Sequence, residues 1–336
     1  MEFRILGSVQ VYDDRADVWI VPTGAKQRAL LGALIVKAGQ VLPADRLVDE
    51  LWGEHPPANA ANALQAHVTR LRRLLPVPPP GSGEPHHEWL VTRPVGYVLR
   101  PGQAGTDAER FHQLVAEGRA LAAADPARAV GTLRRALGLW RGPALEGSGR
   151  GAICSAGAAL LEESRLIALE ALYDAYVRAE MSDGITGELE ELTTVHPLRE
   201  RFYELLMTAL YRCGRQAEAL GAYDRARRRL AHDLGIEPGP ALRGRMEAIL
   251  HHQDPHRLTT GQTAARPPSA VHPRARETGA VRPGTTFDER AGSESGVHLL
   301  RDEIDRLHRH IERLSREQRD LLDRVDRLTS PRAAGQ

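Results

Sequence analysis

The side chains best suited to chemistry in this sequence lie in one stretch, from Ala58 to Leu75. Its polar residues are amides, arginines and one threonine, and it contains no acidic residue: Asn59, Asn62, Gln65, Thr69, Arg70, Arg72 and Arg73. Asn and Gln can pair bidentately with adenine and Arg with guanine, and Arg and Thr also bind phosphates. The stretch therefore favours contact with a nucleic acid, although a solvated amphipathic helix is the alternative.

A helix is the element that would position these side chains. Leu64, Val68, Leu71 and Leu75 follow one another at spacings of four, three and four residues, which places them on one helical stripe. The polar residues then occupy the opposite face. We expect the leucine and valine stripe to be buried and the polar face to point outward.

Composition limits where such an interface can lie. The chain has 336 residues and a net charge of only +1, so any basic surface must be local. With 42% hydrophobic residues it can bury a sizeable core of two or three domains. Cys154 and Cys213 have no partner motif, which argues against a disulfide framework or a zinc site.

The sequence does not favour a metal site, a phosphate loop or a catalytic site. The histidines that could suggest a metal lack cysteine or carboxylate partners at ligand spacing: His86, His87, His251, His252, His308 and His310. The glycines near residue 147 lack the lysine of a phosphate loop, and no catalytic constellation is visible. We expect no metal, no cofactor and no enzyme activity.

The N-terminal region predicts a small α+β domain over residues 1–101. Residues 2–21 alternate as three short antiparallel strands, a helix from Gly24 ends at Gly39, and Pro43 opens a second helix that ends at Gly53. The arginine-bearing helix is third. A Pro/Gly-rich segment over residues 76–88 then leads to two strand-like pieces, over residues 89–92 and 97–99.

These residues carry a family resemblance. The run from KQRALLGALIVKAGQ through ELWG and NALQAHVTRLRRLL, followed by LVTRPVGYVL, resembles the OmpR-type winged helix. More closely, it is similar to the DNA-binding domain of the Streptomyces antibiotic regulatory protein family. The OmpR type implies a four-stranded sheet before the first helix. This sequence departs from the family in its long Pro-rich loop before the wing.

The resemblance places the third helix in the major groove of double-stranded DNA. By helical angle and side-chain chemistry, we expect base contacts from Asn62, Gln65, Thr69 and Arg73, and phosphate contacts from Arg70 and Arg72. The wing around Arg93 and Tyr97 would lie near the adjacent minor groove. Asn59 stands at the start of the helix and completes the predicted interface.

Residues 107–254 are predicted to be helical almost throughout. Paired helices with glycine turns look like a tetratricopeptide (TPR) array, and the runs LWRGPAL, HPLRER and DLGIEPGPALR resemble the bacterial transcriptional activator domain of the same family. The glycine-rich approach over residues 145–158 predicts a loose loop. The resemblance implies binding to direct repeats near promoters and recruitment of RNA polymerase.

The end of the chain predicts a linker over residues 255–296 and a coiled coil over residues 297–329. After Val297, apolar residues repeat at three and four residues with one polar exception: Leu300, Ile304, Leu307, Ile311, Leu314, Gln318, Leu321, Val325 and Leu328. β-Branched residues at a and leucine at d favour a parallel homodimer. A single helix docked on the helical domain is the alternative.

Together these features predict a sequence-specific transcriptional activator of a biosynthetic gene cluster. No apolar run approaches 18 residues, and the chain begins with the strand-like EFRIL, so we expect a cytoplasmic protein with no membrane partner, associated with the nucleoid when bound to DNA. A ligand-gated repressor and a protein-interaction scaffold built on the TPR-like region are the alternatives.

Overall fold

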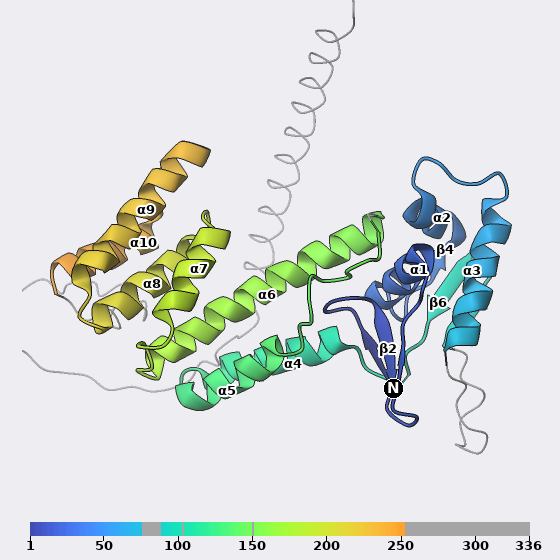
Figure 1. Ribbon diagram of the computed structural model, residues 1–336, viewed down its shortest axis with the longest axis horizontal. Helices are drawn as coiled ribbons and strands as arrows, with labels where there is room; N and C mark the ends of the chain where they lie inside the picture. Colours follow the sequence, from blue (N-terminus) through green and yellow to red (C-terminus); the bar gives the residue numbers. More distant parts are fainter. Residues whose placement is uncertain (76–88, 103, 150, 253–336) are drawn as a thin grey trace, which may run out of the picture. The chain divides into compact units, whose positions relative to one another are not determined.

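The computed structural model describes residues 1–75, 89–102, 104–149 and 151–252 (Figure 1). The chain opens with an antiparallel sheet of three strands in the order β1-β2-β3: Glu2–Arg4, Gln10–Asp13 and Val18–Ile20. Phe3 pairs with Val11, and Val11 pairs with Ile20. Phe3 and Val11 are fully buried because alternate strand residues point to one face.

The fourth strand implied ahead of the first helix is absent from this described part of the chain. Residues from farther along the sequence cover the edge of the sheet instead. Phe3 bridges Thr106, with its N–H donating to the carbonyl of Gly105 at 3.1 Å, and Ser8 bridges Glu146. These contacts pair backbone groups at the edge of the sheet that would otherwise be open to another chain.

Three helices and a second sheet complete the winged-helix arrangement. The helices are α1, Ala25–Val36, α2, Ala44–Trp52, and α3, Ala60–Leu74; the sheet has the order β4-β6-β5, with β4 Leu42–Pro43, β5 Leu90–Arg93 and β6 Gly96–Leu99. The expectation that Pro43 opens the second helix holds to within one residue, because Pro43 is the N-cap of α2. Pro43 belongs to β4, where it lies opposite Gly96, and the helix begins at the next residue.

The following region is helical, as the sequence predicted. It contains α4 Asp107–Leu121, α5 Pro126–Leu137, α6 Ala152–Arg178, α7 Thr186–Val195, α8 Glu200–Arg212, α9 Gln216–Leu234 and α10 Pro240–Leu250. Sequence-adjacent helices pack in pairs, as in a TPR-like array (Figure 1). The start of α4 is fixed by a capping box, in which Thr106 accepts from the N–H of Glu109 at 3.0 Å and Glu109 accepts from that of Thr106 at 3.0 Å.

The loose loop expected over residues 145–158 is wrong in the part that the structure describes. Residues 152–158 are already the first turns of α6. Ahead of them, Leu145 and Ser148 are buried, and the N–H of Leu145 donates to the carbonyl of Ile5 at 2.8 Å. Glycines with positive φ, Gly147 and Gly149, let this segment turn tightly instead of loosening it.

The helical and winged-helix regions belong to one compact unit. The domain boundaries at residues 101 and 107 stay predictions. The predicted linker over residues 255–296 and the coiled coil over residues 297–329, with its heptad positions, lie outside the described residues. Among the helices that are described, none is long and apolar enough to cross a membrane.

Candidate nucleic-acid interface

Helix α3 is anchored through the stripe that the sequence predicted. Leu64, Val68 and Leu71 are at most 1% exposed, and Leu75, directly after the helix, is 6% exposed. They pack into the core with α1 and α2. Burying large aliphatic side chains contributes roughly 1.5–3 kcal/mol each, so the rotation of α3 about its axis is fixed.

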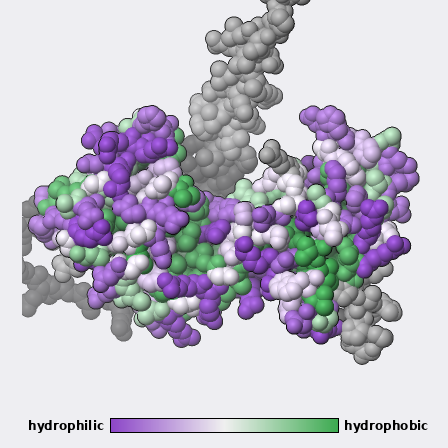
Figure 2. Space-filling view, viewed as in Figure 1, coloured by the Kyte–Doolittle hydropathy of each residue, from purple (hydrophilic) through white to green (hydrophobic). Residues whose placement is uncertain are grey.

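The opposite face of α3 is exposed and carries the predicted contact residues. Asn62, Gln65, Thr69 and Arg73 are exposed at successive spacings of three, four and four residues, so they form one stripe. Arg70 is exposed beside this stripe, and Asn59 occupies the exposed N-cap position. Hydrophilic side chains dominate the surface over α3 at the right of the view (Figure 2).

Most of these side chains are available for an outside partner. Thr69 donates from its hydroxyl to the carbonyl of Gln65 at 2.9 Å, whereas the side chains of Asn62, Gln65, Arg70 and Arg73 form no hydrogen bond within the described residues. The first turn of α3 contains no acidic residue, and its last turn contains two arginines. The stripe therefore offers donors and acceptors to a negatively charged surface without competition from the helix's own acids.

Arg72 differs from its neighbours. Its guanidinium donates from Nε and Nη2 to the carbonyl of Leu90, at 2.9 and 2.8 Å, and from Nη2 to Thr92 Oγ1 at 2.8 Å. Arg72 thus joins α3 to strand β5 of the wing, a role that the sequence did not indicate. Its predicted phosphate contact stays a prediction.

The wing is held beside α3 by the pairing of β5 and β6. Tyr97 is half-buried and lies opposite both Thr92 of β5 and Leu42 of β4, and Arg93 is exposed at the tip opposite Gly96. A Cβ at Gly96 would lie 1.9 Å from the carbonyl oxygen of Leu42, so only glycine allows this close strand approach. Arg93 and Tyr97 therefore lie on the element that Arg72 connects to α3.

Trp52 of α2 and His67 of α3 pack against each other. Their rings lie 5.9 Å apart, and Lys26 Nζ lies 5.3 Å from the Trp52 ring while donating to the carbonyl of Leu51. Burial, followed by the charges of Arg70 and Lys26, lowers the pKa of His67. His67 therefore stays neutral near pH 7 and acts here as a packing residue between α2 and α3.

Two known families cover most of the described part of the chain. The family described as "Transcriptional regulatory protein, C terminal" matches residues 20–99, and "Bacterial transcriptional activator domain" matches residues 106–250. The Transcriptional regulator RedD of Streptomyces coelicolor is 44% identical over 258 residues, which is 76% of this chain and 71% of RedD. This chain belongs to the Streptomyces antibiotic regulatory protein family.

Other relatives extend the comparison. The Regulatory protein DnrI of Streptomyces peucetius is 36% identical over 74% of this chain and 92% of its own length. The structure titled "Mycobacterium tuberculosis EmbR in complex with low affinity phosphopeptide" superposes with a TM-score of 0.68 at 36% identity, covering 75% of this chain and 65% of that one. The OmpR-type and activator-domain assignments are confirmed: the chain is a transcriptional regulator with a winged-helix DNA-binding region.

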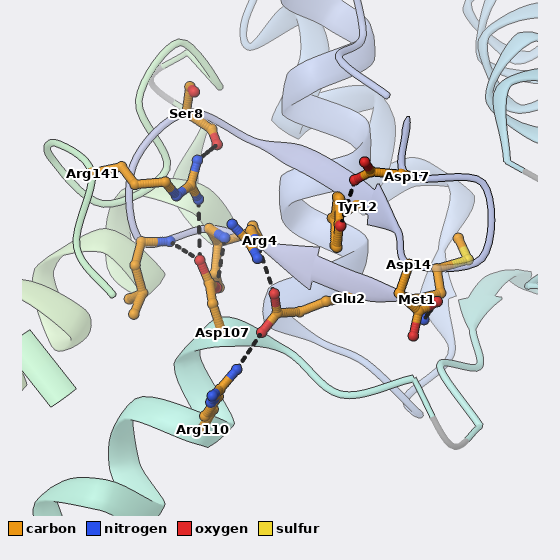
Figure 3. A network of polar contacts seen from close by, with 12 residues as sticks. Met1, Glu2, Arg4, Ser8, Tyr12, Asp14, Asp17, Asp107, Arg110 and Arg141 are labelled. Atoms are coloured by element: carbon orange, nitrogen blue, oxygen red, sulfur yellow. Dashed lines mark hydrogen bonds and ion pairs between the residues drawn. The ribbon is translucent and has the colours of Figure 1, made fainter. Parts of the chain in front are cut away.

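Sequence reasoning missed the residues that join the two regions of this regulator. Asp107, 2% exposed at the start of α4, accepts from the N–H groups of Ile5 and Leu6 at 2.8 and 3.0 Å and from Arg141 Nη2 at 3.1 Å (Figure 3). Arg141 also donates to the carbonyl of Ser8 at 3.3 Å. The sequence signal for this joining role is only that an acidic residue, Asp107, directly follows the helix-capping residue Thr106.

The other reactive groups in the described residues do not form a metal site or a nucleophilic site. No group of three or more His, Cys, Asp or Glu side chains in the described residues could hold a metal ion. Burial, with the nearby Glu50 carboxylate, raises the pKa of the Cys154 thiol to about 12. Because the thiolate is the reactive form of cysteine, Cys154 is chemically inert at neutral pH.

Proposed function

We propose that this regulator is a sequence-specific activator that binds double-stranded DNA at the promoters of a biosynthetic gene cluster. The exposed stripe of α3 is the observation that carries the proposal. It presents Asn62, Gln65, Thr69 and Arg73 in one row, without acidic neighbours on the helix and beside the wing. An α-helix fits the major groove, where these side chains can distinguish base pairs.

The proposed contacts fall into two groups, contacts to base edges and contacts to the phosphate backbone or the minor groove. Asn62 and Gln65 suit adenine, Arg73 suits guanine, and Thr69 can approach either base edges or phosphates. Arg70 and Asn59 flank the row and are placed to bind the backbone, and Arg93 and Tyr97 of the wing reach toward the adjacent minor groove. We assign Arg72 first to the link between α3 and β5, because its guanidinium already has two acceptors there.

Family membership supports a proposal for the larger mechanism. Two protomers would occupy direct repeats, and the helical region would contact the neighbouring protomer and RNA polymerase. The relatives RedD and DnrI are named as regulators, and the region after the winged helix matches an activator domain. These matches support transcriptional activation; the homodimer, the cytoplasmic location and the association with the nucleoid are further parts of the proposal.

A ligand-gated repressor is less well supported. The helical region has a cavity of about 350 Å³ between α4, α6 and α8, but charged side chains line it, including Arg119, Asp174 and Arg201. Arg201 Nη2 is already paired with Asp174 at 2.7 Å. Metabolite pockets are predominantly apolar with a few polar groups, so this lining does not favour a small-molecule effector.

The salt dependence of DNA binding tests the interface. The double substitution Arg70→Ala/Arg73→Ala should weaken binding and reduce the slope of log affinity against log salt by about 0.9, because Arg70 is the phosphate contact of the pair and each lost phosphate contact removes roughly 0.9. The DNA is a duplex bearing a site that the protein itself selects from a random pool. Binding is measured by fluorescence anisotropy across a series of salt concentrations.

A charge-matched control comes from the helical region. Arg119→Ala/Arg128→Ala removes two exposed arginines from α4 and α5 and should leave the slope unchanged. Equal slopes for the two double variants would move the interface away from α3. Failure of the unmodified protein to select any DNA would overturn the proposed function itself.

A further inference from the structure

Glu50 connects the DNA-binding region to the longest helix of the helical region. It lies in α2, the helix that precedes α3, and is 5% exposed. Its Oε2 accepts from the N–H of Ile153 at 2.6 Å, and its Oε1 accepts from the N–H of Cys154 at 3.0 Å. Both donors belong to the first turn of α6, about 100 residues farther along the chain.

Helix α6 lacks a cap of its own. Its N-cap residue is Gly151, which has no side chain, and its first turn contains no acidic residue. The first N–H groups of any helix need acceptors, and a carboxylate there also interacts favourably with the helix dipole. Glu50 therefore supplies, from the other region, the cap that α6 would otherwise carry in its own sequence.

The two regions are in close contact around this cap. A Cβ at Gly151 would lie 2.2 Å from the Glu50 carboxyl carbon and 2.5 Å from its backbone oxygen. A Cβ at Gly157, one to two turns later, would lie 2.8 Å from Val36 Cγ2 of α1. Cys154 Sγ also lies 3.5 Å from the carbonyl of Ala29. The backbone of α6 thus packs directly against α1 and α2, with no room for added side chains.

We propose that Glu50 is a positioning residue that fixes the orientation of α3 relative to the helical region. Because Glu50 does not lie on the exposed stripe, it does not touch DNA. Glu50 fixes α2 to the start of α6, and α2 packs against α3 through the rings of Trp52 and His67. When α3 lies in the major groove, the helical region then occupies one fixed position along the DNA.

The inference rests on the proposed function and adds a prediction about spacing. A helical region held rigidly can meet its neighbour only when two half-sites are separated correctly, because a mismatched geometry prevents simultaneous engagement. A helical region free to swing would accept many separations. Glu50 would therefore determine which spacing of direct repeats the regulator selects.

The first measurement reports orientation without DNA. Spin labels are attached at Arg46→Cys on α2 and Glu191→Cys on α7, both exposed, in a Cys213→Ser background; Cys154 is buried and unreactive. Double electron–electron resonance on the full chain, with the labelled protein diluted in unlabelled protein so that distances within one protomer dominate, should give one narrow distance distribution. Glu50→Gln, which keeps the size of the side chain but loses its charge and one acceptor, should broaden that distribution by about twofold.

The second measurement compares affinities for DNA. On one selected half-site, Glu50→Gln should bind within about twofold of the unmodified protein, because the exposed stripe is unchanged. On duplexes whose two half-sites are separated by stepwise larger distances, the unmodified protein should prefer one separation by about tenfold, and Glu50→Gln should show less than about threefold preference. Asp49→Asn removes the same charge from the exposed side of α2 and should change neither result.

Two further variants separate positioning from stability. Ala152 is exposed at the first position of α6, so Glu50→Gln/Ala152→Asp returns an acid to the helix start without joining the regions. This variant should recover part of any lost melting temperature but not the spacing preference. Gly151→Ala retains Glu50 yet forces α2 and α6 apart, so it should broaden the distances as Glu50→Gln does.

The outcomes are distinguishable. If the unmodified protein binds no DNA, the proposed function fails, while the label distances still report on Glu50. If it binds and Glu50→Gln keeps both the narrow distribution and the spacing preference, the positioning role is overturned. Recovery of the spacing preference in Glu50→Gln/Ala152→Asp would also overturn it, because capping in cis would then suffice.

Discussion

At the scale of single residues, specificity should depend on the two amides of the α3 stripe. Asn62 and Gln65 are exposed and form no side-chain hydrogen bond within the described residues. Replacing either by Ala should cost about 1–3 kcal/mol on the preferred site and relax the preference at one base pair. The check is a binding series on all single-base variants of that site. Equal losses on the preferred site and on random DNA would show that the amides only orient the helix.

Arg72 should matter for stability more than its neighbour does. Arg72→Ala removes three hydrogen bonds to β5 and leaves the carbonyl of Leu90 without this donor, so the free energy of unfolding should fall by roughly 1–2 kcal/mol. Arg73→Ala is the control, because Arg73 is exposed and should change stability by no more than about 0.5 kcal/mol. Urea unfolding of both variants makes the comparison. Indistinguishable midpoints would mean that the bonds to β5 contribute nothing.

The contrast between Arg72 and Arg73 shows how far the sequence can predict this site. Helical periodicity places Leu64, Val68 and Leu71 in the core and their opposite face in solvent, and the structure confirms that division. Periodicity cannot show that Arg72, on the border between the faces, meets a strand 18 residues away. Which polar residue has a partner inside the protein depends on tertiary packing, not on spacing.

At the scale of elements, the wing requires glycine at one position. A Cβ at Gly96 would overlap the carbonyl oxygen of Leu42, so Gly96→Ala should separate β6 from β4 and destabilise the protein by about 3 kcal/mol. Gly131→Ala in α5 is the matched control. No atom lies within 4 Å of its added Cβ, and alanine favours helix, so this variant should gain about 0.5–1 kcal/mol.

Thermal unfolding with a urea series measures both glycine variants. Because both changes add one methyl group to a glycine, the test is whether the free energy of unfolding falls for Gly96→Ala and rises for Gly131→Ala. A Gly96→Ala protein as stable as the Gly131→Ala protein would mean that β4 and β6 are not held at this distance in solution.

The elements that the sequence missed are short or depend on distant residues. Strand β4 has two residues, too few for any alternation to be visible, and its existence depends on Tyr97 and Gly96. The first turns of α6 look like a loop because they follow a run of glycines and lack a cap. Their cap is supplied by Glu50 of α2, a contact that no local pattern could have identified.

At the scale of the molecule, acidic residues join the two regions from both sides. Glu50 of the winged helix caps α6 of the helical region, and Asp107 of the helical region accepts from the backbone of Ile5 and Leu6. Both are buried, and each is paired with backbone N–H groups, so neither carboxylate is left uncompensated. The order of the two regions was predictable from sequence motifs. Their joining was not, because its contacts span about 100 residues.

The proposed coiled coil at the end of the chain predicts how two such molecules share one operator. A linker of the composition of residues 255–296 should span roughly 35 Å, from about 5–6 Å × √n, which is close to one turn of DNA at about 34–36 Å. A parallel coil could therefore hold two winged helices on adjacent repeats, and the linker would let a symmetric coil serve a head-to-tail pair. The gain would come from effective concentration.

Removing residues 297–336 should therefore lower the dimer content and weaken binding to a double site, while a single half-site is bound nearly as before. In the full chain, Ile304→Asp/Ile311→Asp should do the same by placing charge at two a positions. Arg309→Ala/Arg316→Ala makes the same change in net charge at the outward f positions and should leave dimerisation intact. Analytical ultracentrifugation and mobility shifts on both DNAs provide the measurements. A full-length protein that sediments as a monomer at tens of micromolar would rule out the coil and favour the docked helix.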